Sequence, residues 1–194
     1  MIPEENKAEA DCAQQARANH PGDPSQGVLR PKSHSGARIV ALMDGGATIT
    51  DCYRYDLWRR WGAQGADAMF VCLNPSTADD LDDDPTLRRC IGFARSWGFG
   101  GVRIGNLFAY RAQDPRQMLR APDPVGPRND EYLLAMAQSA AIVVAAWGNL
   151  CGHLGRGARV RQLLPRLHYL RLTQSGQPGH PLYLPATLMP QLWR

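Results

Sequence analysis

The sequence predicts an α/β protein in three layers (α/β/α), with helices on both faces of a mainly parallel, four-stranded central sheet. Short apolar runs recur along the chain, and segments with helical spacing separate them. These runs do not alternate between apolar and polar residues, which is typical of strands buried on both faces. Short buried strands that alternate with helices require right-handed crossovers, so neighbouring strands should be parallel.

The first part of the chain is polar and is interrupted by proline, glycine and serine. Such a segment cannot bury enough apolar surface to offset the entropy of ordering it. We therefore expect residues 1–36 to form a flexible tail and residues 37–194 to form a single α/β domain.

Two short segments precede the main alternation of strands and helices. Apolar residues 39–43 and 48–50 bracket a pair of glycines, which indicates a small hairpin or a lead-in strand at the edge of the fold. Residues 53–61 mix aromatic and arginine side chains. Their spacing predicts a short helix whose Leu57 and Trp61 face the core.

From residue 68 onward the patterns of strand and helix alternate. We expect strands at 69–73, 102–107, 141–146 and 169–172, and helices near 85–97, 127–139 and 156–164. Asp83 or Asp84 should cap the first of these helices, with Pro85 in its first turn, because a carboxylate accepts hydrogen bonds from the free N–H groups there.

The residues that follow the four strands should meet in space. The carboxyl ends of parallel strands share one edge of the sheet, and open α/β proteins bind their ligands at that edge. The segments concerned are Asn74-Pro75-Ser76-Thr77, Asn106 with Phe108 to Arg111, Trp147-Gly148-Asn149, and Thr173 to His180-Pro181. Their convergence predicts a binding site.

Three of these residues have a structural interpretation beside the functional one. Asn74 is either a turn former or a side chain that positions a water or reads a polar ligand. Asn106 ends an apolar strand, so its amide would be buried and unpaired unless a ligand or a backbone turn bonds it. His180 lies in a segment too rich in glycine and proline for a core, and is either structural, exposed or functional.

A run of aspartates between Asp79 and Asp84 precedes the first predicted helix. Carboxylate oxygens there could bind a divalent cation, which would suit metal-dependent phosphoryl transfer. The alternative, which we favour, is that most of them are solvated and that one caps the helix and complements its dipole. We therefore assign no metal site and no cofactor.

The amino-acid composition gives evidence about binding partners and about the cellular compartment. Lys7 and Lys32 are the only lysines among 22 basic residues. Arginine suits a nucleic-acid surface because it pairs with phosphate and stacks on flat rings, but a net charge of +4 fits an arginine-rich composition without such a role equally well. Five dispersed cysteines without a Cys-x-x-Cys pair or a signal peptide indicate the cytoplasm. No apolar run approaches the ~20 residues that span a bilayer, so we expect no membrane partner.

Several uncommon motifs occur in a fixed order along the chain. They are Tyr53-Arg54-Tyr55, Leu73 to Asp79, Asp83-Asp84-Pro85-Thr86, Asn106 to Arg111, Asp123 to Pro127, Asn129-Asp130, Ala146-Trp147-Gly148 and His180 to Pro185. This series resembles the bacterial family called domain of unknown function 1643, from about residue 49 to residue 188. The resemblance identifies a family without implying a reaction.

A more distant resemblance is to the uracil-DNA glycosylase superfamily, which has a parallel four-stranded α/β sheet. Asn74-Pro75 resembles its first motif, Gly-Ile-Asn-Pro-Gly in one branch, whose Asn positions the attacking water. His180-Pro181 resembles the start of its second motif, whose His stabilises charge on the departing base. Asn106-Leu107 is similar to a motif whose Asn reads the uracil edge, and Trp147-Gly148 is similar to the Trp-Gly after the third strand.

This resemblance implies an N-glycosidic hydrolase with a pocket for a nucleobase, a nucleotide or a nucleic acid. Asn74 would orient water, Asn106 would read the base, and His180 would stabilise the leaving group. The other expected ligand-binding residues are Pro75, Ser76, Phe108 or Tyr110 as a stacking partner, Trp147, and Arg88, Arg89 and Arg111 as contacts to phosphate.

The chain departs from the superfamily in the segment after its histidine. His-Pro-Leu-Tyr-Leu-Pro, from His180, replaces His-Pro-Ser-Pro-Leu-Ser, which carries the wedge that fills the hole left by a flipped base. A non-catalytic module that binds nucleic acid or nucleotides is therefore the rival hypothesis. Metal-dependent phosphoryl transfer through Asp79 to Asp84 is the third.

Overall fold

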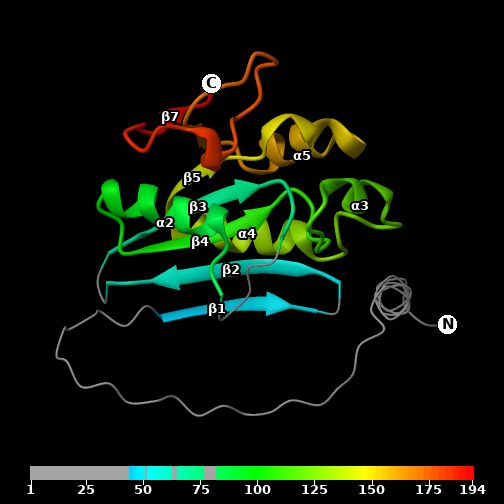
Figure 1. Ribbon diagram of the computed structural model, residues 1–194, viewed down its shortest axis with the longest axis horizontal. Helices are drawn as coiled ribbons and strands as arrows, with labels where there is room; N and C mark the ends of the chain where they lie inside the picture. Colours follow the sequence, from blue (N-terminus) through cyan, green and yellow to red (C-terminus); the bar gives the residue numbers. More distant parts are fainter. Residues whose placement is uncertain (1–43, 51, 63–64, 77–81) are drawn as a thin grey trace, which may run out of the picture.

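The computed structural model describes residues 44–50, 52–62, 65–76 and 82–194. In this part of the chain, one mixed sheet lies between helices (Figure 1). Its strands are β1 (Asp44–Ile49), β2 (Arg54–Arg60), β3 (Asp67–Cys72), β4 (Gly101–Asn106), β5 (Ala140–Ala145), β6 (Leu167–Tyr169) and β7 (Gln191–Leu192). The helices are α2 (Pro85–Ser96), α3 (Pro115–Arg120), α4 (Asn129–Ser139) and α5 (Arg156–Leu163), with short 3₁₀ helices η1 (Gly148–Gly155) and η2 (Pro181–Tyr183).

The strand order is β1-β2-β4-β3-β5-β6-β7. The four central strands, β4, β3, β5 and β6, are parallel. This confirms the mainly parallel α/β fold, but the described sheet has seven strands and is larger than the four predicted. Antiparallel strands extend both sides: β2 and then β1 beside β4, and β7 beside β6.

The prediction of a helix over residues 53–61 is wrong, because these residues form β2. The strand lies between β1 and β4 and pairs with both. Its aromatic side chains suit a strand as well as a helix, and pairing on both sides decides the outcome. Leu57 is buried as expected. Trp61 follows the strand, packs half-buried against the same core cluster, and donates its indole N–H to the Phe99 carbonyl at 2.9 Å.

Helices cover both faces of the sheet (Figure 1). On one face α2 buries Leu87, Cys90 and Phe93 against β3 and β4. On the other face α4 and α5 bury side chains such as Leu133 and Val160. The predicted cap is confirmed, since Asp84 Oδ1 accepts a hydrogen bond from the Leu87 N–H at 2.7 Å and Pro85 begins the helix.

The remaining predicted elements are close to those observed, with a few differences. β6 begins two residues earlier than the predicted strand. The short helix α3 and the 3₁₀ helix η1 were not predicted. The expected tail over 1–36 and the apolar segment 39–43 lie outside the described residues. Among the helices that are described, none combines the length and apolar character needed to cross a membrane.

Candidate functional site

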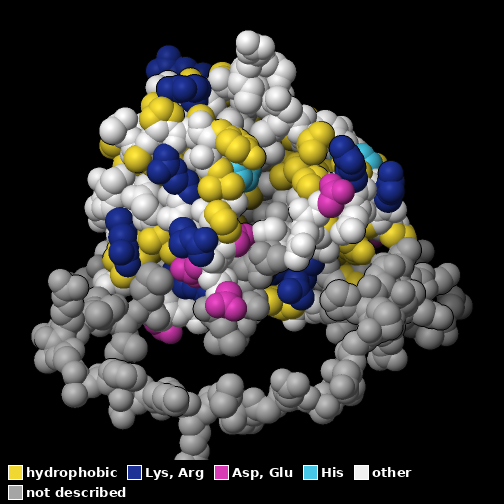
Figure 2. Space-filling view, viewed as in Figure 1, with side chains coloured by type: hydrophobic (Ala, Val, Ile, Leu, Met, Phe, Trp, Pro, Cys, Tyr) yellow, Lys and Arg dark blue, Asp and Glu magenta, His cyan; other side chains and the backbone are white. Residues whose placement is uncertain are grey.

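A cavity of about 360 Å³ lies at the carboxyl ends of β3 and β4, beside the amino end of α2. It brings together Asn74, Asn106, Trp147 and His180, which come from four separate segments. Its other lining residues include Arg54, Leu57, Cys72, Ser76, Asp84, Asn149, Leu150 and Tyr183. Figure 2 shows one face of the molecule, where hydrophobic side chains flank a hollow and arginine side chains are spread around them.

Asn106 is a buried polar residue of the cavity lining. Its side chain is 1% exposed, and neither its Nδ2 nor its Oδ1 has a hydrogen-bond partner among the described residues. A buried polar atom without a partner is destabilising by about 1–3 kcal/mol. This amide therefore presents an unused donor and an unused acceptor to whatever enters the cavity.

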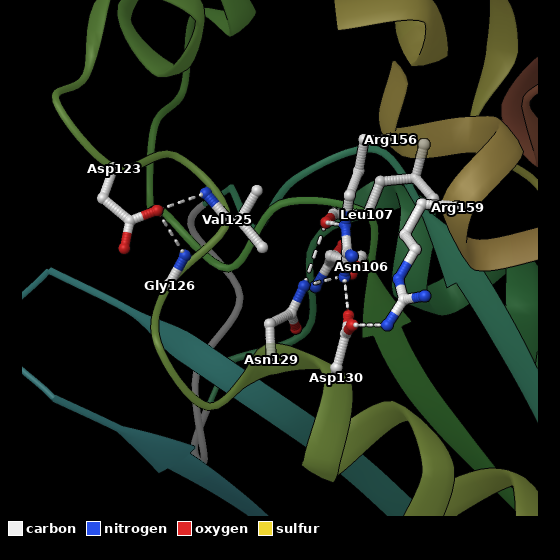
Figure 3. A network of polar contacts seen from close by, with 9 residues as sticks. All are labelled: Asn106, Leu107, Asp123, Val125, Gly126, Asn129, Asp130, Arg156 and Arg159. Carbon is white, nitrogen blue, oxygen red and sulfur yellow. Dashed lines mark hydrogen bonds and ion pairs between the residues drawn. The ribbon is translucent and has the colours of Figure 1, made fainter. Parts of the chain in front are cut away.

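A network on the other side of β4 holds Asn106 in place (Figure 3). The Asn129 amide donates to the backbone carbonyls of Asn106 and Leu107, at 3.0 and 2.9 Å. Arg156 donates from Nε to the same Leu107 carbonyl at 2.7 Å and pairs with Asp130 at 2.6 Å. The backbone after β4 is thus fixed by α4 and α5, and the Asn106 side chain is left to face the cavity.

Trp147 lines the cavity and is also part of the core. Its buried ring belongs to the apolar cluster on the α4 and α5 side of the sheet, where its centroid lies 5.8 Å from that of the Trp193 ring. The Gly148 N–H donates to the Pro178 carbonyl at 2.8 Å, which joins the end of β5 to the segment before His180. The position of Trp147 at the end of β5 is consequently fixed both by the core and by this backbone contact.

The Asn74 amide is oriented by two carbonyls. Nδ2 donates to the carbonyls of Pro75 and Ala112, at 3.0 and 2.8 Å. Both amide hydrogens are used in this way, so Oδ1 is the atom that can accept a hydrogen bond from a water or a ligand. Asn74 is therefore held by hydrogen bonds within the turn and also lines the cavity.

His180 is held in one tautomer. Its Nδ1 accepts a hydrogen bond from the Leu182 N–H at 3.4 Å, so the neutral ring carries its proton on Nε2. Burial lowers the pKa of His180, and the charge of Asp84 opposes part of that shift. The ring is thus a neutral donor at neutral pH.

The cavity also holds one buried cation and one carboxylate. Arg54 is 3% exposed, and burial lowers its pKa to about 10, although Asp84 favours the charged form. Asp84 accepts hydrogen bonds from the Leu87 N–H and from the Ser76 hydroxyl. Because β2 runs antiparallel to β4, its first residue, Arg54, reaches the edge at which the parallel strands end.

A family model described as "Protein of unknown function (DUF1643)" matches residues 54–182. The chain belongs to the DUF1643 family. The match runs from the first residue of β2 into η2, and so includes Asn74, Asn106, Trp147 and His180. Neither the comparison with curated proteins nor the comparison with solved structures found a match.

Several predicted ligand contacts lie elsewhere in the DUF1643 protein. Phe108 is fully buried in the core on the α4 side, with its ring 5.7 Å from that of His153. Tyr110 packs edge-on against Tyr53, at 6.2 Å between ring centroids. Neither ring is among the described residues that line the cavity. The chain turns away from the cavity after Asn106, a turn that depends on Asn129 and Arg156.

The predicted phosphate contacts are also outside the cavity lining. Arg89 donates from Nε to the Pro181 carbonyl at 3.4 Å and from its guanidinium to the Leu184 carbonyl. Its guanidinium also lies over the Phe93 ring, 5.0 Å from the centroid. Arg89 therefore holds η2 against α2. Arg88 is exposed and bonds the Asp83 carbonyl, and Arg111 and Pro75 likewise do not line the cavity.

Two described aspartates before α2, Asp83 and Asp84, bind other groups of the protein. Asp83 pairs with the buried Arg59 at 2.9 Å, and Asp84 caps the helix. Within the described ranges, no three His, Cys, Asp or Glu side chains are grouped so that they could hold a metal ion. Asp79 and Asp80 lie outside those ranges, as does Thr77.

Sequence reasoning did not assign Arg54, Asp84 and Tyr183 to the cavity. Arg54 depends on the direction of β2, which was expected to be a helix. Tyr183 stands three residues after His180, in the segment where the chain departs from the glycosylase motif. The tyrosine in this departing segment is the sequence signal that could have indicated an aromatic residue at the cavity.

Proposed function

We propose that this DUF1643 protein binds a nucleobase in the cavity and hydrolyses the N-glycosidic bond that joins the base to its sugar. The observation that carries the proposal is the buried amide of Asn106, which lacks a partner among the described residues. A primary amide presents a donor and an acceptor side by side, and nucleobase edges present the complementary pair. A bound base would satisfy both atoms.

The other polar groups fit hydrolysis. Asn74 Oδ1 would accept a hydrogen bond from the attacking water, whose oxygen forms a bond to the sugar carbon as the carbon–nitrogen bond breaks. The electron pair of that bond leaves with the base, and the neutral His180 Nε2–H would donate to the charge that builds there. The water loses one proton in this step, and Asp84 is the carboxylate of the described lining that could accept it.

The distant resemblance to the uracil-DNA glycosylase superfamily supports this reaction, because Asn74 and His180 stand where its water-positioning and charge-stabilising residues stand. The geometry adds to that support. Both side chains line one cavity with Asn106, and each is oriented by hydrogen bonds to backbone atoms. Groups that are fixed before the reaction begins stabilise a transition state without a cost of reorganisation.

Base release from defined substrates tests the proposal. The panel consists of single strands and duplexes that contain uracil, hypoxanthine or a mismatch, together with free nucleosides. We expect Asn74→Ala and His180→Ala each to slow base release by roughly 10²-fold or more while leaving binding largely intact. Arg88→Ala, an exposed change on α2 outside the cavity, should have little effect.

The same assay separates the enzyme from a binding module. Tight binding without release of any base from this panel would contradict the hydrolase and favour a non-catalytic module that uses the same cavity. In that case Asn74→Ala and His180→Ala should weaken affinity instead of rate.

A further inference from the structure

One aromatic side chain at the rim of the cavity faces solvent. Tyr183 lines the cavity and is 83% exposed. Leu150, on the neighbouring segment of the rim, is 46% exposed and also lines the cavity. The two side chains together place an apolar surface directly beside the opening.

This exposure is held in place by the fold. Pro181 and Leu184, on either side of Leu182 and Tyr183, are buried. Arg89 bonds the carbonyls of both buried residues and so fixes the ends of this turn to α2. The Tyr183 ring is consequently presented to solvent by an anchored backbone, and little conformational freedom is lost when a ligand packs on it.

The ring also stands next to a group assigned to the reaction. The centroids of the His180 and Tyr183 rings are 5.6 Å apart, and the rings are tilted by 47° instead of stacked. Tyr183 therefore keeps a flat face that His180 does not cover. A planar group bound there would adjoin a base that His180 contacts.

We infer that the cavity takes one base of a single-stranded nucleic acid and that the neighbouring base of the strand stacks on Tyr183. The inference rests on the proposed function and narrows its substrate class. A free base or nucleoside would fill the cavity and leave the Tyr183 ring in water. An aromatic ring accepts any base on its face, which suits a strand of varied sequence.

A single strand fits better than a duplex. In a duplex the target base must first be unpaired and unstacked, at a cost of a few kcal/mol, whereas a single strand offers it directly. The basic residues are almost entirely arginine, which can pair with the phosphates of such a strand.

The test compares ligands of two lengths. For each of adenine, cytosine, guanine, uracil and hypoxanthine, the nucleoside 5′-monophosphate is paired with a trinucleotide that carries the same nucleotide between two thymidines. Affinities are measured by calorimetry at one salt concentration. We expect the trinucleotide of the preferred base to bind about tenfold or more tightly than its monophosphate, the size of one base–aromatic stacking interaction.

Substitutions at the rim of the cavity test whether Tyr183 causes the tighter binding of the trinucleotide. Tyr183→Ala should remove most of the trinucleotide's advantage and leave the monophosphate affinity unchanged, whereas Tyr183→Trp should keep the advantage. Met189→Ala is the matched control, because Met189 is also exposed but does not line the cavity.

Three outcomes would overturn the inference. If the monophosphate binds and the trinucleotide gains nothing, or if Tyr183→Ala weakens both ligands equally, the stacking role fails while the base pocket stands. If a duplex with the same central base binds as tightly as the single strand, the preference for single strands is wrong. If neither length of ligand binds for any base, the proposed function fails, and this inference with it.

Discussion

At the scale of single residues, the main feature is a polar side chain that does not serve the stability of the unliganded protein. Asn106 is buried at the end of β4 with both amide atoms unpaired among the described residues. Asn129, by contrast, is buried and donates two hydrogen bonds to backbone carbonyls. The two asparagines share a residue type and a region of the fold, but only Asn129 satisfies its own donors.

This contrast predicts opposite effects of the same substitution. Asn106→Leu has similar volume and removes two unpaired polar atoms, so it should raise the free energy of unfolding of the unliganded protein by about 1–3 kcal/mol and abolish base binding. Asn129→Leu should lower the free energy of unfolding, because two carbonyls lose their donor. Urea denaturation measures both, and a loss of stability in Asn106→Leu would show that its amide already has a partner.

His180 predicts a dependence of stability on pH. Burial lowers its pKa in the folded protein below the ordinary value of 6.5, so the unfolded chain binds the proton more readily. Stability should therefore fall as the pH decreases below about 6.5, until the folded protein is also protonated. His180→Gln should lose less stability than the wild type between pH 7.5 and pH 5.5 in urea denaturation. Equal losses would mean that His180 has the same pKa in both states.

At the scale of elements, the site depends on the attachment of η2 to α2. The sequence places Arg89 on a helix near the cavity, where a phosphate contact was expected. Its donors instead face the carbonyls of Pro181 and Leu184. Arg89 is thus a positioning residue, which acts on the ligand through His180 and Tyr183.

An anchoring role and a phosphate-binding role for Arg89 predict different effects of its substitution on the salt dependence of ligand binding. Arg89→Met should weaken ligand binding because the turn that carries His180 loses its anchor, but the slope of log K against log salt concentration should stay the same. A lost phosphate contact would instead lower the magnitude of that slope by about one. Arg88→Met, one residue away and exposed, is the control and should change affinity little.

At the scale of the whole molecule, the sheet has a rigid centre and weaker borders. Every residue of β3 is buried, and the strand is paired on both sides, with β4 and β5. β1 has one neighbour in the described sheet, and its residues are partly exposed. The cavity lies at the end of the rigid centre, where the positions of Asn74 and Asn106 are best defined.

Hydrogen exchange should reproduce this gradient. Amide hydrogens of β3 and the middle of β4 should exchange slowest, because they open only with global unfolding. Those of β1 should exchange orders of magnitude faster through local opening. Mass spectrometry or NMR can measure the difference, and equal protection of β1 and β3 would show that another segment covers the β1 edge.

The sequence was informative where burial alone determines structure. The strands at 69–73 and 141–146 are apolar runs, and 102–107 has apolar residues beside Arg103 and Asn106. Burial on both faces suits such strands whichever strand is their neighbour. The placement of Asn74, Asn106 and Trp147 follows from those strands. Asp84 as a cap was likewise predictable, since the cap depends only on the next few residues.

The remaining features depend on partners that are distant in the sequence. β2 is a strand because β1 and β4 pair with it, and its residues 54–60 suit either structure locally. The burial of Phe108 depends on the turn that Asn129 and Arg156 fix after β4. The role of Arg89 depends on carbonyls more than ninety residues away.

The order of the strands also constrains how a nascent chain acquires its site. β2 pairs with β4 and not with β3, so a β1–β2 hairpin that has left the ribosome must wait for Gly101–Asn106 before it can join the sheet. At a synthesis rate of ~5–20 residues per second, this wait lasts several seconds. The edge of β2 is available for contacts with other chains during that time. His180 emerges later still, so a ligand cannot assist the early steps of folding and can stabilise only a nearly completed domain.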